Sequence, residues 1–463
     1  MIFNSLDFLL FFPFVWLVFY FLKNQNQKAN WLLISSLFFY GYWKPEYLIL
    51  LTLTSTIDYF SALYIQKSES RRARKIGLLA SIVSNLSILI LFKYSHFLAS
   101  NLNLAGWLNE TPAWLNLVLP VGISFYTFQA MAYVIDVYRK RLPAEKSFSR
   151  FLLFITFFPQ LVAGPIERAP HLMVQLTRLK AATSEKIIPA LWLICMGLWK
   201  KVFIADRLGV FVDGVFNNIP ESNGIQCLLA IFFFGIQIYC DFSGYSDIAR
   251  GIARFFGVNL MLNFNNPYLA TSLTDFWRRW HISLSGWFRD YVYHPLGGGR
   301  NGYSRTFVNI LIVFLLSGIW HGANWTFLMW GLWHGLGLVL ERVFGMVKNR
   351  AIPYRLATLF WIFAGWTFFR INSIYDLDLF LQKIQEFDWS GFQQFNLFRS
   401  NWEFLLAALG IVSLLMIEKY QTLRFRWYSR LSQNQRMAWI TTMFLMLIWL
   451  GKFKGQDFIY FQF

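Results

Sequence analysis

The histidines are the residues of this sequence best suited to acid–base chemistry, and they are distributed unevenly along the chain. Four of the six histidines fall between residues 281 and 334: His281, His294, His321 and His334. His321 lies in Ser317-Gly318-Ile319-Trp320-His321-Gly322-Ala323-Asn324-Trp325, inside the apolar run Phe307 to Trp333. A full charge at membrane depth costs about 2.5–3.5 kcal/mol on insertion scales, but histidine can stay neutral there and still accept a proton. His321 is therefore a candidate general base in a dry site, and a histidine that only hydrogen-bonds a neighbouring helix is the alternative.

A second candidate, His281, belongs to a polar and aromatic segment between residues 251 and 305 that is too broken to form one membrane span. Helical spacing there places Trp277, Trp280, His281 and Leu284 on one face, and Arg278, Ser285 and Arg289 on another. Asp275 can pair with Arg278 or Arg279 one turn on. The alternative is an interfacial amphipathic helix with tryptophan anchors and a solvated basic stripe.

The remaining motifs restrict the chemistry. The histidine spacings match neither HExxH nor any other short ligand pair, so we predict no metal site. The sequence has no GxSxG elbow and no Walker motif, and Gly297 to Gly302 is typical of a turn. Direct acyl transfer is then the simplest chemistry for two separated histidines: one removes a proton from an acceptor hydroxyl, and the other positions the donor carbonyl or stabilises the oxyanion. His334 follows His321 by thirteen residues, on a different face of a continuous helix, and is interpreted as structural.

The composition indicates an all-α polytopic membrane protein. The chain has 463 residues, of which 56% are hydrophobic and only 14% are charged, whereas soluble proteins are about 25% charged. Mean hydropathy is +0.43. The net charge of +18 is concentrated between apolar runs, which fits contact with membrane lipid and does not favour nucleic-acid binding. None of the three cysteines belongs to a CxxC pair, so no disulfide or zinc framework is expected.

Apolar runs indicate about 12 transmembrane helices. They begin near Leu6, Trp31, Tyr47, Ile76, Trp114, Ile187, Gln226, Thr306, Thr326, Leu356, Glu403 and Met437. The short run Phe151 to Pro165 contains Phe158-Pro159 and Gly164-Pro165, which predict a re-entrant or broken segment. Basic loops alternate as the positive-inside rule requires, except that Lys200, Lys201 and Arg207 flank a segment that the alternation ends outside.

Several motifs together resemble the membrane-bound O-acyltransferase (MBOAT) superfamily. The core motif is Asp275-Phe276-Trp277-Arg278-Arg279-Trp280-His281-Ile282-Ser283-Leu284-Ser285, followed by Gly318-Ile319-Trp320-His321-Gly322. Val121-Gly122-Ile123-Ser124-Phe125, Gly164-Pro165-Ile166 and Asp241-Phe242-Ser243-Gly244-Tyr245 are similar to the branch that holds alginate O-acetylase. The resemblance extends to about Glu341. Beyond Arg342 only length and hydrophobicity agree.

The resemblance implies a single domain over residues 1–463, with core motifs at 120–341 and additional helices at 355–452. It implies re-entrant or interfacial helices and a ring or cone around a central tunnel, with His321 as general base and His281 as the second active-site residue. We assign donor binding or the tunnel wall to Asp275, Trp277, Arg278, Arg279, Trp280, Arg289, Trp320 and Asn324. No bound cofactor is implied.

The same resemblance implies a location in the inner or cytoplasmic membrane and acetyl-CoA as the acyl donor. The acetyl group would move toward an extracytoplasmic polysaccharide, reached directly or through an extracytoplasmic acetyltransferase partner. D-alanyl transfer from a carrier-protein thioester is the nearest alternative. A polymer transporter is an alternative of another class, although the inverted repeats common in transporters are not visible. An inactive scaffold is opposed by the intact histidines.

Overall fold

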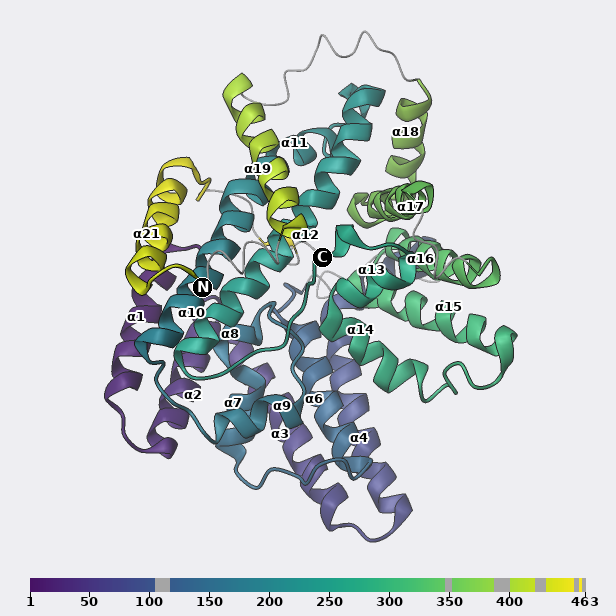
Figure 1. Cartoon of the computed structure of the whole chain (residues 1–463). Helices are drawn as coiled ribbons and strands as arrows, with labels where there is room; N and C mark the ends of the chain where they lie inside the picture. The colour runs from purple at the N-terminus through teal and green to yellow at the C-terminus, as the bar shows by residue number, and fades with distance from the viewer. Residues whose placement is uncertain (105–116, 346–351, 387–399, 421–429, 454–457, 460–463) are drawn as a thin grey trace. The chain divides into compact units, whose positions relative to one another are not determined.

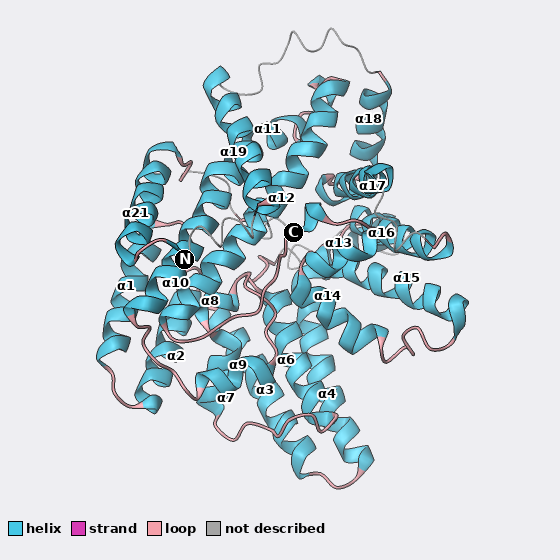
Figure 2. Cartoon of the chain, viewed as in Figure 1, coloured by secondary structure: helices cyan, strands magenta, loops and turns pink. Residues whose placement is uncertain are grey.

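The computed structural model describes residues 1–104, 117–345, 352–386, 400–420, 430–453 and 458–459. These residues form helices and loops with no strand among them (Figure 2). Among them, six helical stretches are long and apolar enough to cross a membrane: Tyr47–Lys67, Arg71–Leu104, Ser184–Phe216, Gly224–Phe255, Gly302–His321 and Asn401–Lys419. The prediction of an all-α, multi-pass membrane protein is confirmed at this level.

The predicted apolar runs correspond to helices. Each overlaps a helix of the described chain, although the beginning of the run at Trp114 lies outside the described residues. Several of these helices are shorter than a bilayer requires, such as Leu6–Phe21 with 16 residues. The count of about twelve crossings and the central tunnel therefore stay predictions.

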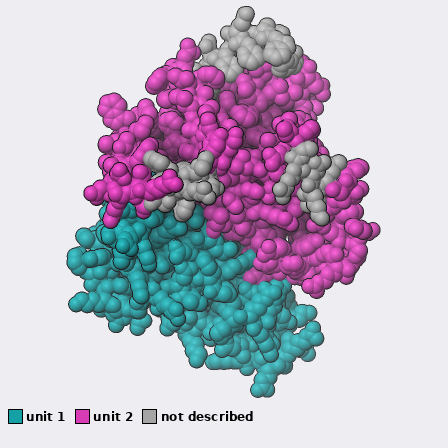
Figure 3. All heavy atoms as spheres, in the orientation of Figure 1, with its two compact units in different colours: residues 1–194, 248–261 teal, residues 195–247, 262–463 magenta. Residues whose placement is uncertain are grey.

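The chain divides into two compact units, which Figure 3 distinguishes by colour. Unit 1 comprises residues 1–194 and 248–261, and unit 2 comprises residues 195–247 and 262–463. Helices α10 and α12 contribute residues to both units. The single domain over residues 1–463 was inferred from the family resemblance, and it stays a prediction.

Unit 1 is built from the helices of the N-terminal part of the chain (Figure 1). They are α1 (Leu6–Phe21), α2 (Gln25–Gly41), α3 (Tyr47–Lys67), α4 (Arg71–Leu89), α5 (Ser95–Leu104), α6 (Ile123–Tyr138), α7 (Phe148–Thr156), α8 (Phe158–Leu161), α9 (Ala169–Leu176) and the first part of α10 (Ser184–Leu198). A π-helical turn, Ile90–Tyr94, joins α4 to α5. Buried polar groups link α3 to α4, because the Asp58 carboxylate accepts hydrogen bonds from Ser81 and Asn85.

The predicted break between Phe151 and Pro165 is present. Helix α7 ends at Thr156, and Phe157 has non-helical backbone angles before the short helix α8. The carbonyl of Phe154, freed by the break, accepts hydrogen bonds from the side-chain amides of Gln129 (2.6 Å) and Gln160 (2.9 Å). A broken helix is tolerated in an apolar protein only when its freed backbone groups find such partners.

Unit 2 contains the elements that carry the candidate residues. They are the first part of the long α12 (Gly224–Phe255), α11 (Asp206–Phe216), α13 (Leu273–Arg279), α14 (Ile282–Phe288), α15 (Gly302–His321), α16 (Trp325–Val343), α17 (Ile352–Arg370), α18 (Ile374–Gln385), α19 (Asn401–Lys419) and α21 (Gln433–Leu450). Two π-helical segments, Trp199–Ala205 and Arg289–Tyr293, interrupt them. The turn predicted at Gly297 to Gly302 is confirmed, with positive φ at Gly297, Gly298 and Gly302.

Buried ion pairs explain the basic residues that disagreed with the charge alternation. The pairs are Lys200–Asp247 (2.8 Å), Lys201–Asp206 (2.8 Å), Lys201–Asp241 (2.8 Å) and Arg207–Glu403 (2.7 Å). Lys201 and Arg207 are almost fully buried. These cations are part of the helix packing and not of a loop, so the positive-inside rule, which concerns loops, does not apply to them.

Candidate active site

The segment around His281 is broken, where the sequence predicted one helix. Helix α13 ends at Arg279, Trp280 is extended, and α14 begins at Ile282. His281 itself has left-handed backbone angles, φ +42° and ψ +54°. The predicted continuous helix is therefore wrong, because a residue with left-handed backbone angles interrupts it between two short helices. The four residues predicted to share one face, Trp277, Trp280, His281 and Leu284, nevertheless line one cavity.

The start of α13 is fixed by carboxylate and hydroxyl groups. The Ser272 side chain accepts a hydrogen bond from the Asp275 N–H at 3.0 Å. The buried carboxylate of Glu341, from α16, accepts from the N–H groups of Leu273 (2.6 Å) and Thr274 (3.0 Å). A carboxylate at a helix N-terminus satisfies otherwise unpaired N–H groups and favours the helix dipole. Glu341 thereby ties α13 to α16.

Close backbone approach positions His321 at the end of α15. A Cβ on Gly318 would lie 2.2 Å from the Phe327 carbonyl oxygen, and one on Gly331 would lie 2.3 Å from the Phe314 carbonyl oxygen. Only glycine allows α15 and α16 to pack at this distance. The helix ends at His321 because Gly322 is extended. Asn324 then begins α16 as its N-cap, accepting from the Thr326 N–H at 3.3 Å.

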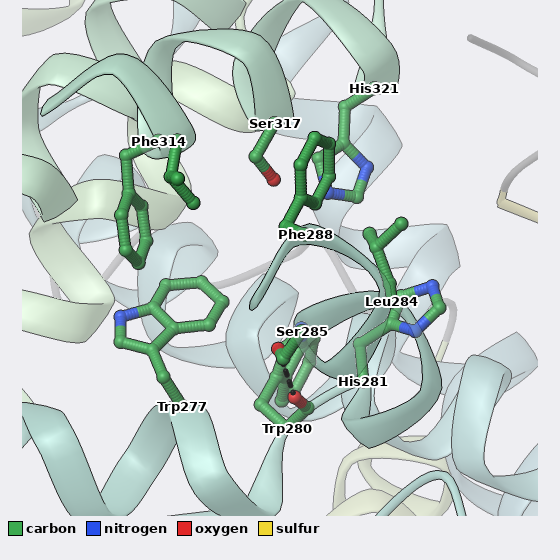
Figure 4. Close-up of a pocket in the computed structure, with 10 residues that line it drawn as sticks. Trp277, Trp280, His281, Leu284, Ser285, Phe288, Phe314, Ser317 and His321 are labelled. Atoms are coloured by element: carbon green, nitrogen blue, oxygen red, sulfur yellow. Dashed lines mark hydrogen bonds between the residues drawn. The ribbon is translucent and has the colours of Figure 1, made fainter. Parts of the chain in front are cut away.

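His281 and His321 line the same cavity, whose volume is about 170 Å³ (Figure 4). The lining residues are Trp277, Trp280, His281, Leu284, Ser285, Phe288, Val313, Phe314, Ser317 and His321. The polar groups of the lining are the two imidazoles, two serine hydroxyls and two indole N–H groups, and the other side chains are apolar. The Ser285 hydroxyl donates to the Trp280 carbonyl at 3.3 Å, shown as the dashed line in Figure 4.

Aromatic rings surround the His281 imidazole. Its ring centroid lies 4.7 Å from that of Phe242 and 6.0 Å from that of Trp320, both in edge-to-face geometry. Only 1% of the residue is exposed. Burial lowers the pKa of His281 to about 3, because an apolar environment disfavours the charged imidazolium. The His281 ring is therefore neutral near pH 7.

His321 is enclosed in the same manner by a second set of rings. Its centroid lies 4.9 Å from that of Trp320, 4.9 Å from that of Trp330 and 5.1 Å from that of Phe369. Trp320 thus contacts both imidazoles. The two histidines that the sequence singled out line one cavity, and aromatic rings surround both.

His334 lies nearer to this site than the sequence indicated. His334 lies on α16, whereas His321 is the last residue of α15. The sequence prediction had assumed one continuous helix through both histidines, and that assumption was wrong. The His334 ring lies 5.2 Å from Trp330 and 5.0 Å from Trp277, and neither ring nitrogen has a hydrogen-bond partner within the described part of the chain. Trp330 consequently packs between His321 and His334. His334 does not line the cavity.

The residues assigned to donor binding separate into two groups. Trp277 and Trp280 line the cavity, whereas Asp275, Arg278, Arg279, Arg289, Trp320 and Asn324 do not. The predicted pairing is confirmed for Arg279, whose Nε lies 2.8 Å from Asp275 Oδ1. Burial is the largest single influence and raises the pKa of Asp275, but the hydrogen bonds from Arg279 and the Thr271 N–H and the nearby arginine charges together outweigh it, so the pKa is lowered. Arg278 and Arg289 are exposed, and Arg289 pairs with Asp290 at 2.9 Å.

Sequence reasoning missed four cavity residues and misplaced one. Phe288, Val313, Phe314 and Ser317 were not singled out, and Ser285 was assigned to the basic face although it lines the cavity beside His281. A local signal existed: Ser285 and Phe288 follow His281 at i+4 and i+7, and Ser317 and Phe314 precede His321 at the same spacings. Counting outward from each histidine would have found them. In the described residues, no three His, Cys, Asp or Glu side chains gather as a metal-ligand group.

The apolar helices and the two buried imidazoles at one cavity fit a helical membrane enzyme of the acyltransferase class, and the comparisons with known proteins show that class directly. The model of MBOAT, the membrane-bound O-acyltransferase family, matches residues 139–351. A protein described as "probable alginate O-acetylase AlgI" from Pseudomonas aeruginosa is 38% identical over 383 residues, covering 81% of this chain and 73% of the relative. This chain belongs to the membrane-bound O-acyltransferase family and is an O-acyltransferase.

Two further relatives differ in the group that their names say they transfer. The peptidoglycan O-acetyltransferase of Helicobacter pylori is 36% identical over 384 residues, covering 76% of this chain and 72% of the relative. The teichoic acid D-alanyltransferase of Bacillus subtilis is 29% identical over 218 residues, covering 45% of this chain and 55% of the relative. The similarity to the acetyl-transferring proteins is both higher and longer.

Proposed function

We propose that the protein transfers an acetyl group from acetyl-CoA toward hydroxyl groups of an extracytoplasmic polysaccharide, and that it does so in the cytoplasmic membrane. The observation that carries this proposal is the position of His281 and His321 on one cavity lined mainly by aromatic and apolar side chains. At about 170 Å³ the cavity is smaller than the roughly 300–1,000 Å³ of pockets that hold whole small molecules. It suits the reactive ends of donor and acceptor.

The two histidines would divide the work. His321 removes the proton from the acceptor hydroxyl as its oxygen attacks the thioester carbonyl. When the carbon–sulfur bond breaks, the leaving thiolate takes that proton from the His321 imidazolium. His281, neutral and buried, donates its ring N–H to the oxyanion that forms on the carbonyl oxygen. The surrounding rings exclude water, which would otherwise hydrolyse the thioester.

Exposed arginines support an anionic donor. Arg278 and Arg289 are exposed near the cavity-lining helices α13 and α14, and Arg279 is partly exposed. Arginine binds phosphate well, and CoA carries several phosphate charges. Arg289→Ala should raise the apparent KM for acetyl-CoA more than it lowers kcat, as expected for a residue that contributes to donor binding alone. A fall in kcat as large as the rise in KM would contradict this role.

The side from which the donor enters can be tested with a single cysteine. The native Cys195, Cys227 and Cys240 are all buried, so an impermeant thiol reagent should report on an engineered site with little background. Arg300→Cys, in the exposed glycine-rich turn, should react only when the reagent reaches the cytoplasmic face. Labelling from the outside alone would reject a cytoplasmic donor entrance.

Acetyl transfer is favoured over D-alanyl transfer by the relatives. The proteins named for O-acetylation share 36–38% identity across most of this chain, against 29% across less than half of it for a D-alanyltransferase. Purified protein should therefore hydrolyse acetyl-CoA slowly, and its activity should rise when an extracytoplasmic acetyltransferase partner is supplied. Activity with a D-alanyl carrier-protein thioester, and none with acetyl-CoA, would support the alternative.

The decisive experiment measures both the mass and the ester content of secreted polysaccharide. Cells lacking the chain should export normal polymer mass without acetyl esters. His321→Ala should fail to restore the esters, with a rate loss of about 10²–10⁴-fold. His96→Ala, a substitution of an exposed histidine in α5, is the matched control and should restore them. Reduced polymer mass at unchanged ester density would instead favour a transporter.

A further inference from the structure

His281 occupies a left-handed backbone conformation that is uncommon for any residue other than glycine, although histidine is among the residues that adopt it more often. Non-glycine residues rarely adopt positive φ, and the cost is usually borne only where surrounding contacts hold the residue in place. His281 is also the N-cap of α14, but its side chain makes no capping hydrogen bond. An N-cap side chain normally accepts from the N–H two or three residues on. Here the imidazole lines the cavity instead, so another group must provide the cap.

The segment Asn263–Asn265 binds the backbone on both sides of His281. The Asn265 N–H donates to the carbonyl of Arg279 at 2.9 Å, two residues before His281. The Ile282 N–H donates to the carbonyl of Asn263 at 2.9 Å, after it. These two hydrogen bonds enclose Trp280 and His281. They hold the ends of α13 and α14 against a segment that is remote from both in sequence.

The Asn263 side chain supplies the missing cap. Its Oδ1 accepts from the N–H of Ser283 at 3.2 Å and from the Ser283 hydroxyl at 2.9 Å. Its Nδ2 donates to the Ser246 hydroxyl in α12 at 3.4 Å. Asn263 is fully buried, and Ser246 and Ser283 are 2% exposed. Ser283 is the second residue of α14, which is the position that an N-cap side chain usually binds.

We propose that Asn263 is a positioning residue that caps α14 in place of His281 and thereby leaves the His281 imidazole free to face the cavity. The four backbone and side-chain hydrogen bonds of Asn263 fix the left-handed turn, and the turn fixes the direction of the ring. This inference rests on the proposed function only for its catalytic consequence. The placement of the ring itself can be measured without any activity.

The first experiment measures ring placement. Diethyl pyrocarbonate modifies accessible imidazoles, and peptide mass spectrometry gives the rate at each histidine. His281 should be protected in the native protein and should react at least about fivefold faster in Asn263→Leu, which keeps the shape but loses the hydrogen bonds. Asn263→Asp can still accept from Ser283 and Ser246, so it should restore most of the protection. Unchanged His281 reactivity in folded Asn263→Leu would overturn the inference.

A matched control separates positioning from general loosening. Asn309 is also fully buried in unit 2, and its Nδ2 donates to the carbonyls of Leu296 (3.3 Å) and Gly298 (2.9 Å). Asn309→Leu removes hydrogen bonds of the same kind without touching the His281 turn, so His281 should stay protected. Equal exposure of His281 in both leucine variants would mean general loosening and would overturn the proposal.

The second experiment is a double-mutant cycle on acetyl transfer. If Asn263 acts through His281, Asn263→Leu should lower kcat by about ten- to a hundredfold in the native background and less than about twofold in His281→Ala. If Asn263→Leu acted only by loosening the structure, it would lower kcat by the same factor in the native and the His281→Ala backgrounds, and that result would overturn the proposal. Should Asn263→Leu fail to fold, Ser283→Ala removes only the hydroxyl donor and should expose His281 to a smaller degree, with unchanged reactivity counting against the proposal. Full activity of His281→Ala would reject the catalytic part of His281, while the reactivity series would still decide on Asn263.

Discussion

The left-handed turn makes a specific prediction about which side chains can replace His281. At φ +42° and ψ +54°, an ordinary L-residue bears roughly 1–2 kcal/mol of steric cost. Asparagine tolerates this region better, whereas alanine and glutamine do not. A difference of 1–2 kcal/mol corresponds to a factor of about 5–30 in the population of the native turn. His281→Asn should therefore be about 5- to 30-fold more active than His281→Gln and His281→Ala.

Glutamine is the informative comparison, because it carries the same amide as asparagine. If only the reach of the side chain mattered, His281→Gln would equal or exceed His281→Asn. If the backbone matters, asparagine should be the better replacement. His281→Gly completes the series: it relieves the backbone but has no side chain, so it should melt no lower than His281→Ala while remaining as inactive.

The assay is the initial rate of acetyl transfer per folded protein, with folding checked by size-exclusion chromatography after detergent extraction. The activity order His, Asn, then Gln and Ala together is the expected result. Glutamine at or above asparagine would refute the backbone argument. Full activity of the alanine variant would remove His281 from the reaction altogether.

Three further predictions follow from buried groups. Because burial lowers the pKa of His281 to about 3, its ring gains a proton only as the pH falls through about 3. Wild type and His281→Asn should therefore show the same pH dependence of kcat/KM between pH 5 and 8, and an acidic limb present only in wild type would contradict this. Gly365→Ala places a Cβ 2.4 Å from His334 Nε2 and should lower the melting temperature by the equivalent of about 1–3 kcal/mol; His334→Ala in the same chain should recover part of the loss, and an additive effect would argue against the clash. Lys201→Met leaves two buried aspartates without their shared cation, which should lower the free energy of unfolding by about 3–5 kcal/mol. The yield of folded protein should fall, and it should rise again when Asp241→Asn is added. A normal yield of Lys201→Met would mean that this cluster is not needed for folding.

Features that depend on local spacing could be predicted from the sequence. Apolar runs marked the helices, and Pro159 and Gly164 marked the broken segment between α7 and α9. Asp275 and Arg279, one helical turn apart, form the expected ion pair. Each of these features is determined by residues within a few positions of one another.

Features that depend on distant contacts could not be predicted in this way. No glycine or proline marks the helix break at His281, because the turn there is held by Asn263, eighteen residues earlier. The break after His321 was read as part of a continuous helix, which placed His334 too far away. Lys201 was counted as a loop charge because its partner Asp241 lies forty residues on. At His281 and Lys201 a hydrogen bond or ion pair between remote segments overrides the local pattern.

The part of the chain beyond the family match also contributes to the histidine environment. The match ends at residue 351, yet Phe369 of α17 lies 5.1 Å from His321, and Trp366 of the same helix lies 4.8 Å from Trp280. Near the C-terminus, Phe458 packs on Phe242, the ring that contacts His281. The segments with the weakest sequence signal thus contribute rings to the surroundings of both imidazoles. Because acyl transfer from a thioester requires that water be excluded, the apolar rings of these segments take part in building the site.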